Sequence, residues 1–492
     1  MKWTALRIIP PLDRYPAVVR FAQTPLGKVA VLAVYAAGLL GLERFFWIDM
    51  MVILAAMTFF PQWRRGLLLL GTTYWLLKYT LFDWHKLAKV IHDLGLESIT
   101  DWVALKSSVI AAVILYCACF YAAAVRWQDT WLFRRPLVTM FSVYFVLVFC
   151  ALHAPLDPAV RAYLWGFIIV FGRYIWFLAY SLTDRRSAHD DGLPWQFRSY
   201  LPFWIGVTTS PAPIAKGAAY LRRIEAKTPE ELAISQLKGV KLLYWAGVLV
   251  VFETIVNNVL HGAPGYLEEY FHIPYSLGLP IFRDAMNAAI AGHPLSWYSN
   301  WLSLFAQLLK NVLYIAIWGH VIVSGARMAG FNALRGTYKP LAAKTLTEFW
   351  NRYFYYFKEL LVEFFFYPVY LRYFKKHPRI RLFAATLAAA GFGNVLFHYI
   401  RDIEYIIDMG LWQALLAFHV YIFYGMVLGT GIAISQWRQR QNQRRRHWFR
   451  EEVMSRVGVV VFFCFMLIFD DPDRTLTLKD NFVFVLSLFG IG

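Results

Sequence analysis

The chain has 492 residues, of which 59% are hydrophobic, 18% aromatic and only 16% charged. This composition is too apolar for a soluble protein of this length, and it predicts an all-α, polytopic integral membrane protein. The formal net charge of +18 does not indicate nucleic-acid binding, because the basic residues fall between long apolar runs, as in cytoplasmic membrane loops. We therefore expect the lipid bilayer as a partner and no nucleic acid.

Residues 1–28 are expected to form a cytoplasmic or interfacial segment. Three prolines and several arginines interrupt the first 20 residues, which does not match the layout of a cleaved signal peptide. The amino terminus is therefore predicted to stay in the cytoplasm. The four cysteines all lie within apolar runs, where cysteine behaves as a small hydrophobe, so neither a disulfide framework nor a metal site is expected.

About eleven apolar runs are long enough to approach the roughly 20 residues that cross a bilayer core. We expect them to form a single transmembrane domain over 29–469, with short helices that stay at the surface. The expected spans are 29–43, 49–61, 67–82, 107–125, 137–153, 161–182, 242–260, 301–324, 382–400, 411–435 and 456–469.

The loops between these runs alternate in charge along the chain. Basic loops such as 438–450 are predicted to face the cytoplasm, and acidic ones such as 470–480 to face outwards. Polar stretches at 215–241 and 436–455 are expected as cytoplasmic helices. Residues 470–492 are expected to be a C-terminal tail.

Two apolar segments, 200–214 and 346–373, have basic residues on both sides and do not fit simple crossings. Each is expected to enter and leave the membrane on the same side, which requires surrounding protein or a water-filled cavity. The aromatic 346–373 segment equally fits an interfacial amphipathic helix, because tryptophan and tyrosine favour that depth.

Histidine is the residue type that points most directly to chemistry, because an ionisable group at membrane depth marks a functional site by default. Three histidines fall inside apolar runs, His320, His398 and His419. His398 has Asn394 four residues earlier, on the same helical face. The preceding Gly-Phe-Gly, 391–393, permits close approach of a substrate or of a neighbouring helix, and the sequence leaves both open.

The segment 345–398 resembles the signature region of the membrane-bound O-acyltransferase family, in its bacterial alginate O-acetyltransferase-like branch. Phe349, Trp350 and Arg352 match its FW-x-R motif, Tyr367 and Pro368 match an aromatic-proline step, and His398 matches the intramembrane histidine. The resemblance covers about 200–435, which would be the acyltransferase-like core. Family members usually carry His or Asn where this chain has Phe354.

The resemblance implies transfer of an acyl group, acetyl above all, from a cytoplasmic thioester such as acyl-CoA to a hydroxyl. His398 would be the general base, and Asn394 or Asn351 would donate a hydrogen bond to the oxyanion. No tightly bound cofactor is expected. A basic group at the start of the His398 helix would contact the phosphates of CoA or serve only as a topology anchor. This group comprises Arg372, Lys375, Lys376, Arg379 and Arg381.

The acceptor implied by the resemblance is an extracellular polysaccharide or envelope glycan, and the location a bacterial inner membrane. An outer loop, 261–300, is where a periplasmic or extracellular partner protein would dock. Two alternatives stay open. Polar groups at depth also mark a transporter or flippase of an envelope precursor, and the departure at Phe354 also fits a non-catalytic scaffold subunit.

Overall fold

A computed structural model describes the chain over 9–42, 48–78, 84–99, 101–186, 216–262, 276–441 and 449–491. Within these ranges the secondary structure is helical, and the only β pairing is an isolated bridge between Glu225 and Phe331. Several helices are long and apolar enough to cross a membrane. The all-helical class predicted from composition is therefore confirmed for the described part of the chain, together with its membrane character.

The described residues form two compact units. Unit 1 takes residues within 1–242, 322–334 and 400–414, and unit 2 takes those within 243–321, 335–399 and 415–492. Both candidate asparagines and His398 belong to unit 2. The expected acyltransferase-like core, about 200–435, is drawn from both units.

Unit 1 begins with a sharply bent helix pair, α1 (Pro16–Gln23) and α2 (Pro25–Leu40), whose axes differ by 101°. Thr24 lies at the bend with extended backbone, and its side chain accepts a hydrogen bond from the amide of Gly27. This N-cap and the proline that follows it end one helix and start the next. Two shorter helices come after the bend, α3 (Ile48–Phe59) and α4 (Arg64–Lys78).

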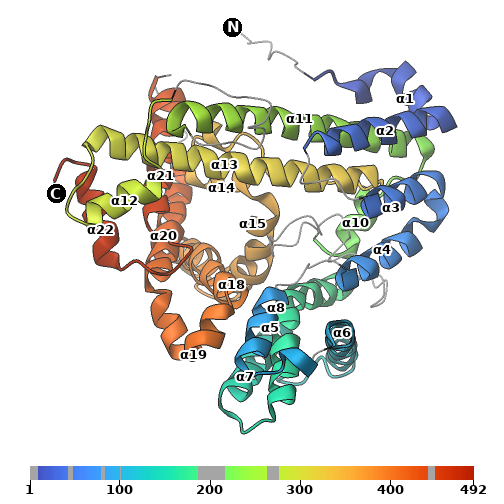
Figure 1. The fold of residues 1–492 in the computed structure, drawn as a ribbon, viewed down its shortest axis with the longest axis horizontal. Coiled ribbons are helices and arrows are strands. Elements are labelled where there is room, and N and C mark those ends of the chain that lie inside the picture. Colours follow the sequence, from blue (N-terminus) through green and yellow to red (C-terminus); the bar gives the residue numbers. More distant parts are fainter. Residues whose placement is uncertain are drawn as a thin grey trace. The chain divides into compact units, whose positions relative to one another are not determined.

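A bundle of four helices forms the next part of unit 1 (Figure 1). Its long helix α8 packs against the other three, and its Phe171, Tyr174 and Trp176 are almost completely buried. An apolar surface around most of a helix is expected when other helices surround it. The bundle comprises α5 (Trp84–Asp93), α6 (Trp102–Arg126), α7 (Pro136–His153) and α8 (Pro158–Arg186).

Only the first part of the polar stretch 215–241 forms a separate helix. A short helix, α10 (Ala218–Ile224), is followed by α11 (Pro229–His261), which runs without a break through the expected span at 242–260. Helix continuity needs only satisfied backbone hydrogen bonds, and no proline or glycine pair interrupts this stretch. The polar first turns of α11 therefore continue directly into its apolar part.

Unit 2 holds the candidate site and the C-terminal elements. Part of the expected docking loop 261–300 forms α12 (Phe282–Ile290), before the long helix α13 (Trp297–Met328). The last part of the chain forms α20 (His419–Gln441), α21 (Ser455–Ile468) and α22 (Leu478–Ser487). The remaining elements of the unit are described with the site below.

The expected tail at 470–492 contains a packed helix rather than a free end. Helix α22 packs against α12 and α21, and its Phe484 is completely buried. The helix starts with a capping box, in which Thr477 and Asp480 bind each other's backbone amides. Hydrogen bonds from the Thr477 hydroxyl and amide hold the pKa of Asp480 below its ordinary value.

Seven of the eleven expected spans correspond to helices that are long and apolar enough to cross a bilayer, or eight if the bent α1–α2 pair counts as one. The seven are α6, α7, α8, α11, α13, the helix over 378–401, and α20. The other expected spans fall on shorter helices; α3, for example, has 12 residues, or about 18 Å against a core of about 30 Å. The count of eleven is therefore not confirmed.

One expected span is divided between two helices. The span expected over 411–435 begins in one helix, α19 (Glu404–Ala417), and continues in α20, with Phe418 at the break. Gly410, with φ of 80°, kinks α19 itself. The re-entrant segment expected at 200–214 lies outside the described residues.

Candidate functional site

The site is built on two stretches of unit 2 whose helices are interrupted. The first is the aromatic segment that the sequence singled out, and Phe354 breaks it with φ of −144° and ψ of 75°. Thr345 caps its first helix by accepting a hydrogen bond from the amide of Glu348 (3.1 Å). The segment forms α14 (Leu346–Tyr353), α15 (Tyr355–Leu361), the π-helical turn η6 (Val362–Phe366) and α16 (Tyr367–Arg372).

This segment is packed into unit 2 along most of its length. Phe349, Tyr356 and Leu360 are almost completely buried. Helix α14 packs against α20, and α15 packs against the π-helical turn η7 (Leu387–Gly393). The exposed residues of the segment are Asn351 on α14 and most of its end, including Tyr367 and Leu371. Of the two arrangements expected from the sequence, this burial favours a broken segment enclosed by protein over an amphipathic helix lying at the lipid surface.

The second stretch carries His398 and is one helix with a wide turn inside it. It begins as α17 (Pro378–Thr386), widens to the π-helical η7 (Leu387–Gly393) and resumes as α18 (Asn394–Arg401). π-Helical turns are rare, and they are frequent at functional sites. The Gly-Phe-Gly that the sequence singled out forms the end of the wide turn.

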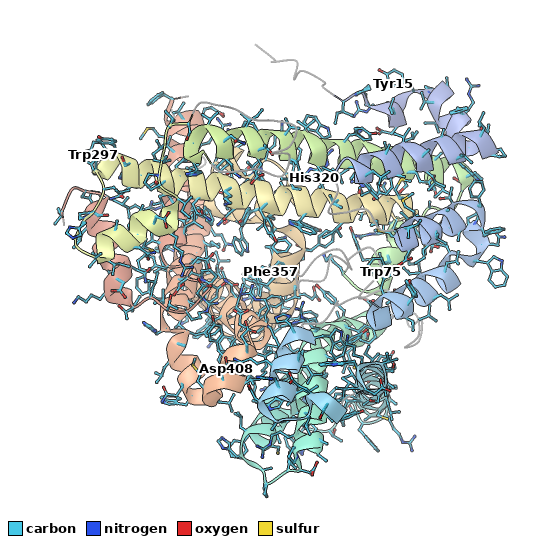
Figure 2. The ribbon with its side chains drawn as sticks, in the orientation of Figure 1. Tyr15, Trp75, Trp297, His320, Phe357 and Asp408 are labelled. Carbon is cyan, nitrogen blue, oxygen red and sulfur yellow. The ribbon has the colours of Figure 1, made fainter. Side chains whose placement is uncertain are left out.

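Aromatic rings surround the half-buried His398. The ring of Phe357, on α15, stands perpendicular to the imidazole at 6.0 Å between centroids, and Phe397 lies at 5.7 Å. Tyr421, on α20, is the nearest of these rings, at 4.8 Å. Three rings, two of them from other helices, therefore restrict the orientation of the imidazole (Phe357 is labelled in Figure 2).

Asn394 and His398 lie one helical turn apart on α18, and Tyr421 contacts both. The Tyr421 hydroxyl donates to Oδ1 of Asn394 at 3.4 Å. Asn394 is 1% exposed, and its Nδ2 has no hydrogen-bond partner among the described residues. The asparagine thus presents a buried donor one helical turn from the histidine.

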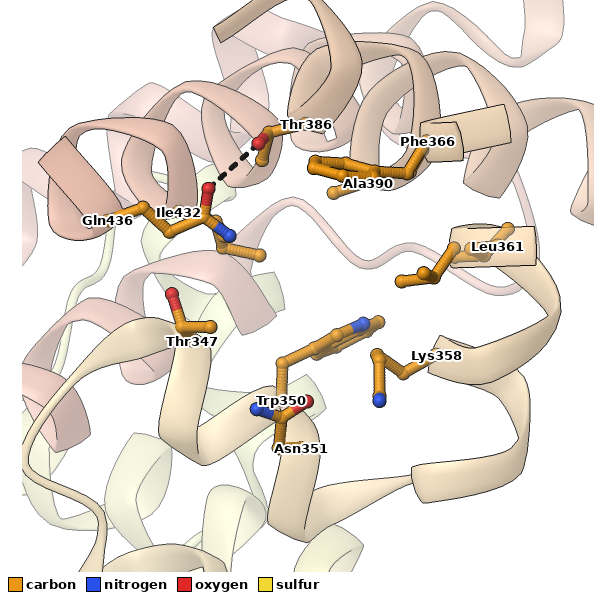
Figure 3. A pocket seen from close by; sticks show the side chains of 12 residues that line it. Thr347, Trp350, Asn351, Lys358, Leu361, Phe366, Thr386, Ala390, Ile432 and Gln436 are labelled. Atoms are coloured by element: carbon orange, nitrogen blue, oxygen red, sulfur yellow. Dashed lines mark hydrogen bonds between the residues drawn. The ribbon is translucent and has the colours of Figure 1, made fainter. Parts of the chain in front are cut away.

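A cavity of about 160 Å³ lies between the two interrupted stretches (Figure 3), and its lining does not include His398, Asn394 or Tyr421. Trp350, Leu361 and Phe366 form part of its apolar wall. On the other side Thr386 donates from its hydroxyl to Oε1 of Gln436 (2.9 Å). The complete lining is Thr347, Trp350, Asn351, Lys358, Leu361, Val362, Phe366, Thr386, Ala389, Ala390, Ile432 and Gln436.

The cavity and His398 are connected by shared elements. Ala390 lines the cavity, and His398 follows eight residues later, about 12 Å along the helix. Trp350 lines the cavity as well, and its ring lies 6.4 Å from that of Phe357, which contacts His398. Asn351, the second candidate asparagine, lines the cavity and is exposed, whereas Asn394 belongs to the histidine cluster.

The predicted basic group is not part of the cavity lining. Four of its members are exposed around the turn between α16 and α17. Arg379 and Arg381 lie over the rings of Trp437 and Tyr370, at 5.1 and 4.0 Å. The cation that does line the cavity is Lys358, which forms an ion pair with Glu359. Sequence spacing could not identify it, because a single lysine in an aromatic segment is an ordinary surface pattern.

Phe354, His320 and His419, which the sequence also singled out, lie outside the cavity lining. Phe354 lies 5.8 Å from Phe357 between ring centroids, so it is one ring removed from His398 and does not line the cavity. His320 is buried on α13 with Nδ1 against the carbonyl of Ala316. His419 is exposed at the first residue of α20. Of the three histidines in apolar runs, His398 alone lies in this cluster.

Sequence reasoning missed Tyr421 entirely. It lies 27 residues beyond Asn394 on another helix, and nothing in its local sequence distinguishes it from other membrane tyrosines. The cavity residues Thr347, Thr386 and Gln436 were missed for the same reason, since each comes from a different helix.

No protein-family model matches this chain, and no curated protein sequence matches it significantly.

Proposed function

We propose that this protein is an integral-membrane O-acyltransferase. The observation that carries the proposal is the cluster of the half-buried His398 with the buried Asn394 and Tyr421, on helices that also line a cavity. A base, a hydrogen-bond donor and an adjacent space for a reactant are the parts that acyl transfer requires. The sequence resemblance to membrane-bound O-acyltransferases points to the same reaction.

In this reaction Nε2 or Nδ1 of His398 accepts the proton of the acceptor hydroxyl as its oxygen attacks the thioester carbonyl. A hydrogen bond from Nδ2 of Asn394 stabilises the oxyanion of the tetrahedral intermediate. The intermediate collapses by breaking the carbon–sulfur bond, and the leaving thiolate takes the proton back from the imidazolium. The products are an ester and a free thiol, with no net change in protonation.

The cavity suits a section of the donor arm, because its lining does not include His398, Asn394 or Tyr421, where the acyl carbonyl must react. Its volume of about 160 Å³ is close to that of a cavity that holds one benzene molecule, about 150 Å³, and the choice of acetyl as the acyl group rests on the sequence resemblance. Uncharged polar groups of Asn351, Thr347 and Gln436 face an uncharged donor arm, because Lys358 is already paired with Glu359. The exposed basic group around Arg372 and Lys375 then contacts the phosphates of acyl-CoA at the cytoplasmic surface.

The acceptor is a hydroxyl of an extracellular polysaccharide or envelope glycan, presented from the outer side. In this proposal the protein lies in a bacterial inner membrane with a cytoplasmic amino terminus and about eleven crossings. A periplasmic or extracellular partner that docks at 261–300 would bring the acceptor.

The test is an assay of the purified protein with radiolabelled acetyl-CoA, which follows thioester hydrolysis and transfer to added glycan. We expect His398→Ala and His398→Gln to lower the rate by about 10²- to 10⁴-fold, the usual contribution of a general base. His419→Ala is the matched control, because this histidine is exposed at the start of α20 and should leave the rate unchanged.

Activity that survives in both His398 variants would refute the assigned base. A wild-type protein that neither hydrolyses nor transfers acetyl groups would refute the enzyme and favour the transporter or scaffold.

A further inference from the structure

Arg474, in the C-terminal segment, lies over two aromatic rings, one of which contacts His398. The guanidinium carbon of Arg474 is 4.3 Å from the ring centroid of Phe418 and 4.4 Å from that of Tyr421. Both rings are buried, at 0% and 3% exposure. Cations over aromatic faces are attracted by the ring quadrupole, more strongly where water is excluded. Arg474 therefore fixes the ring that contacts His398.

Hydrogen bonds within the loop that carries Arg474 fix the position of this residue. Asp471 is 5% exposed, and its carboxylate accepts hydrogen bonds from the amides of Asp473 (3.2 Å) and Leu476 (2.8 Å). Nη1 of Arg474 donates to the carbonyl of Asp471 at 2.6 Å. Arg474 itself has φ of 53°, a left-handed conformation that is uncommon for a residue other than glycine. Such a conformation persists where the surrounding contacts determine it.

The ring held by Arg474 is directly connected to the proposed chemistry. The Tyr421 hydroxyl donates to Oδ1 of Asn394, and its ring lies 4.8 Å from the imidazole of His398. Tyr421 is also stacked on Tyr424, with centroids 5.0 Å apart and 15° between planes. A shift of the Tyr421 ring would therefore move both Asn394 and His398.

We propose that Arg474 is a positioning residue of the acyl-transfer site, acting through Tyr421. Its guanidinium holds the tyrosine ring so that the hydroxyl stays on Asn394, which in turn keeps Nδ2 of Asn394 aimed at the oxyanion beside His398. This inference rests on the proposed function, and it makes the C-terminal loop 470–477 a part of the catalytic apparatus.

The first experiment is a double-mutant cycle on acetyl transfer with Arg474→Met, Tyr421→Phe and the double variant. A misplacement of catalytic groups by about 1 Å costs on the order of 10²-fold in rate. We expect Arg474→Met to lower kcat about 10- to 100-fold with KM for acetyl-CoA unchanged. Arg474→Lys should restore part of the loss, because a lysine also binds aromatic faces.

The cycle separates positioning from general destabilisation. If Arg474 acts through the Tyr421 hydroxyl, Arg474→Met has no further effect in the Tyr421→Phe background, so the two losses are not additive. Losses that multiply would overturn the proposal. Arg283→Gln is the control, since it removes an exposed guanidinium that pairs with Asp473 on the same loop without touching the rings.

A second readout does not require activity. Histidine labelled with ¹³C at Cε1 gives an NMR signal for His398, assigned by its loss in His398→Ala. We expect this signal to move in Arg474→Met and in Tyr421→Phe but not in Arg283→Gln, and an unmoved signal in Arg474→Met would overturn the inference. Failure of the acyltransferase proposal would appear separately, as a wild-type protein without transfer activity.

Discussion

Asn394 is a buried polar residue of the site whose side chain is only partly hydrogen-bonded among the described residues. It is almost completely buried, and its amide nitrogen has no partner among the described residues. An unsatisfied buried donor costs about 1–3 kcal/mol, and in a native structure such a group calls for an explanation. One explanation fits its place beside His398: the amide nitrogen donates a hydrogen bond to the negative charge that forms only during the reaction.

The two candidate asparagines should therefore differ in kinetics. We expect Asn394→Ala to lower kcat by about 10²- to 10³-fold, the usual loss of one oxyanion donor. Asn351→Ala should instead raise KM for acetyl-CoA, because Asn351 lines the cavity without contact to the histidine cluster. Steady-state kinetics of both variants checks this. The reverse pattern would assign the oxyanion to Asn351.

The glycines of η7 determine how closely the His398 helix approaches α20. A Cβ atom built at Gly391 would lie 3.3 Å from the carbonyl oxygen of Gly425, and one built at Gly429 would lie 3.2 Å from the amide nitrogen of Gly391. The two backbones are thus in direct contact, as small residues allow between membrane helices. Of the two meanings that the sequence left open for the Gly-Phe-Gly segment, helix packing is the one observed.

Gly429→Ala should destabilise the protein by about 1–3 kcal/mol, because backbone atoms cannot move aside to accept the methyl group. Gly458→Ala is the matched control on α21, where an added Cβ meets nothing within 4 Å; it should be neutral or stabilising by about 0.4–1 kcal/mol. Thermal unfolding of the purified variants measures both. If Gly429→Ala unfolds at the same temperature as Gly458→Ala or higher, the helices are not in backbone contact.

At the scale of the whole molecule, charge decides which ends of the spans face the cytoplasm. Three expected spans, 382–400, 411–435 and 456–469, separate two charged segments. The basic cluster around Lys375 precedes them, and the acidic segment 470–480, which contains Lys479, follows them. The third falls on α21, whose 14 residues extend about 21 Å, less than a typical core. Whether α21 crosses determines whether these two positions face the same side.

Cysteine labelling measures this directly. In a variant with the four native cysteines replaced by serine, Lys375→Cys should react with a membrane-impermeant maleimide only after cells are permeabilised, because basic loops are retained inside. Lys479→Cys should react in intact cells. If both positions react only after permeabilisation, α21 does not cross and the expected span at 456–469 must be withdrawn.

The sequence determined the class of the protein and the local part of the site. Seven of the eleven predicted spans fall, within the described residues, on helices long enough to cross a bilayer, because crossing requires an apolar length that composition reveals. The four-residue spacing of Asn394 and His398 placed both on one face of α18, since helical periodicity depends only on neighbouring residues.

Only the tertiary structure decided which distant residues join them. Tyr421 reaches Asn394 from another helix, the cavity takes residues from several helices, and Arg474 contacts Tyr421 from a loop expected to be a free tail. Such contacts follow from how helices pack. Packing depends on the fit between side chains of elements that are far apart in the chain, and sequence periodicity and charge do not encode that fit.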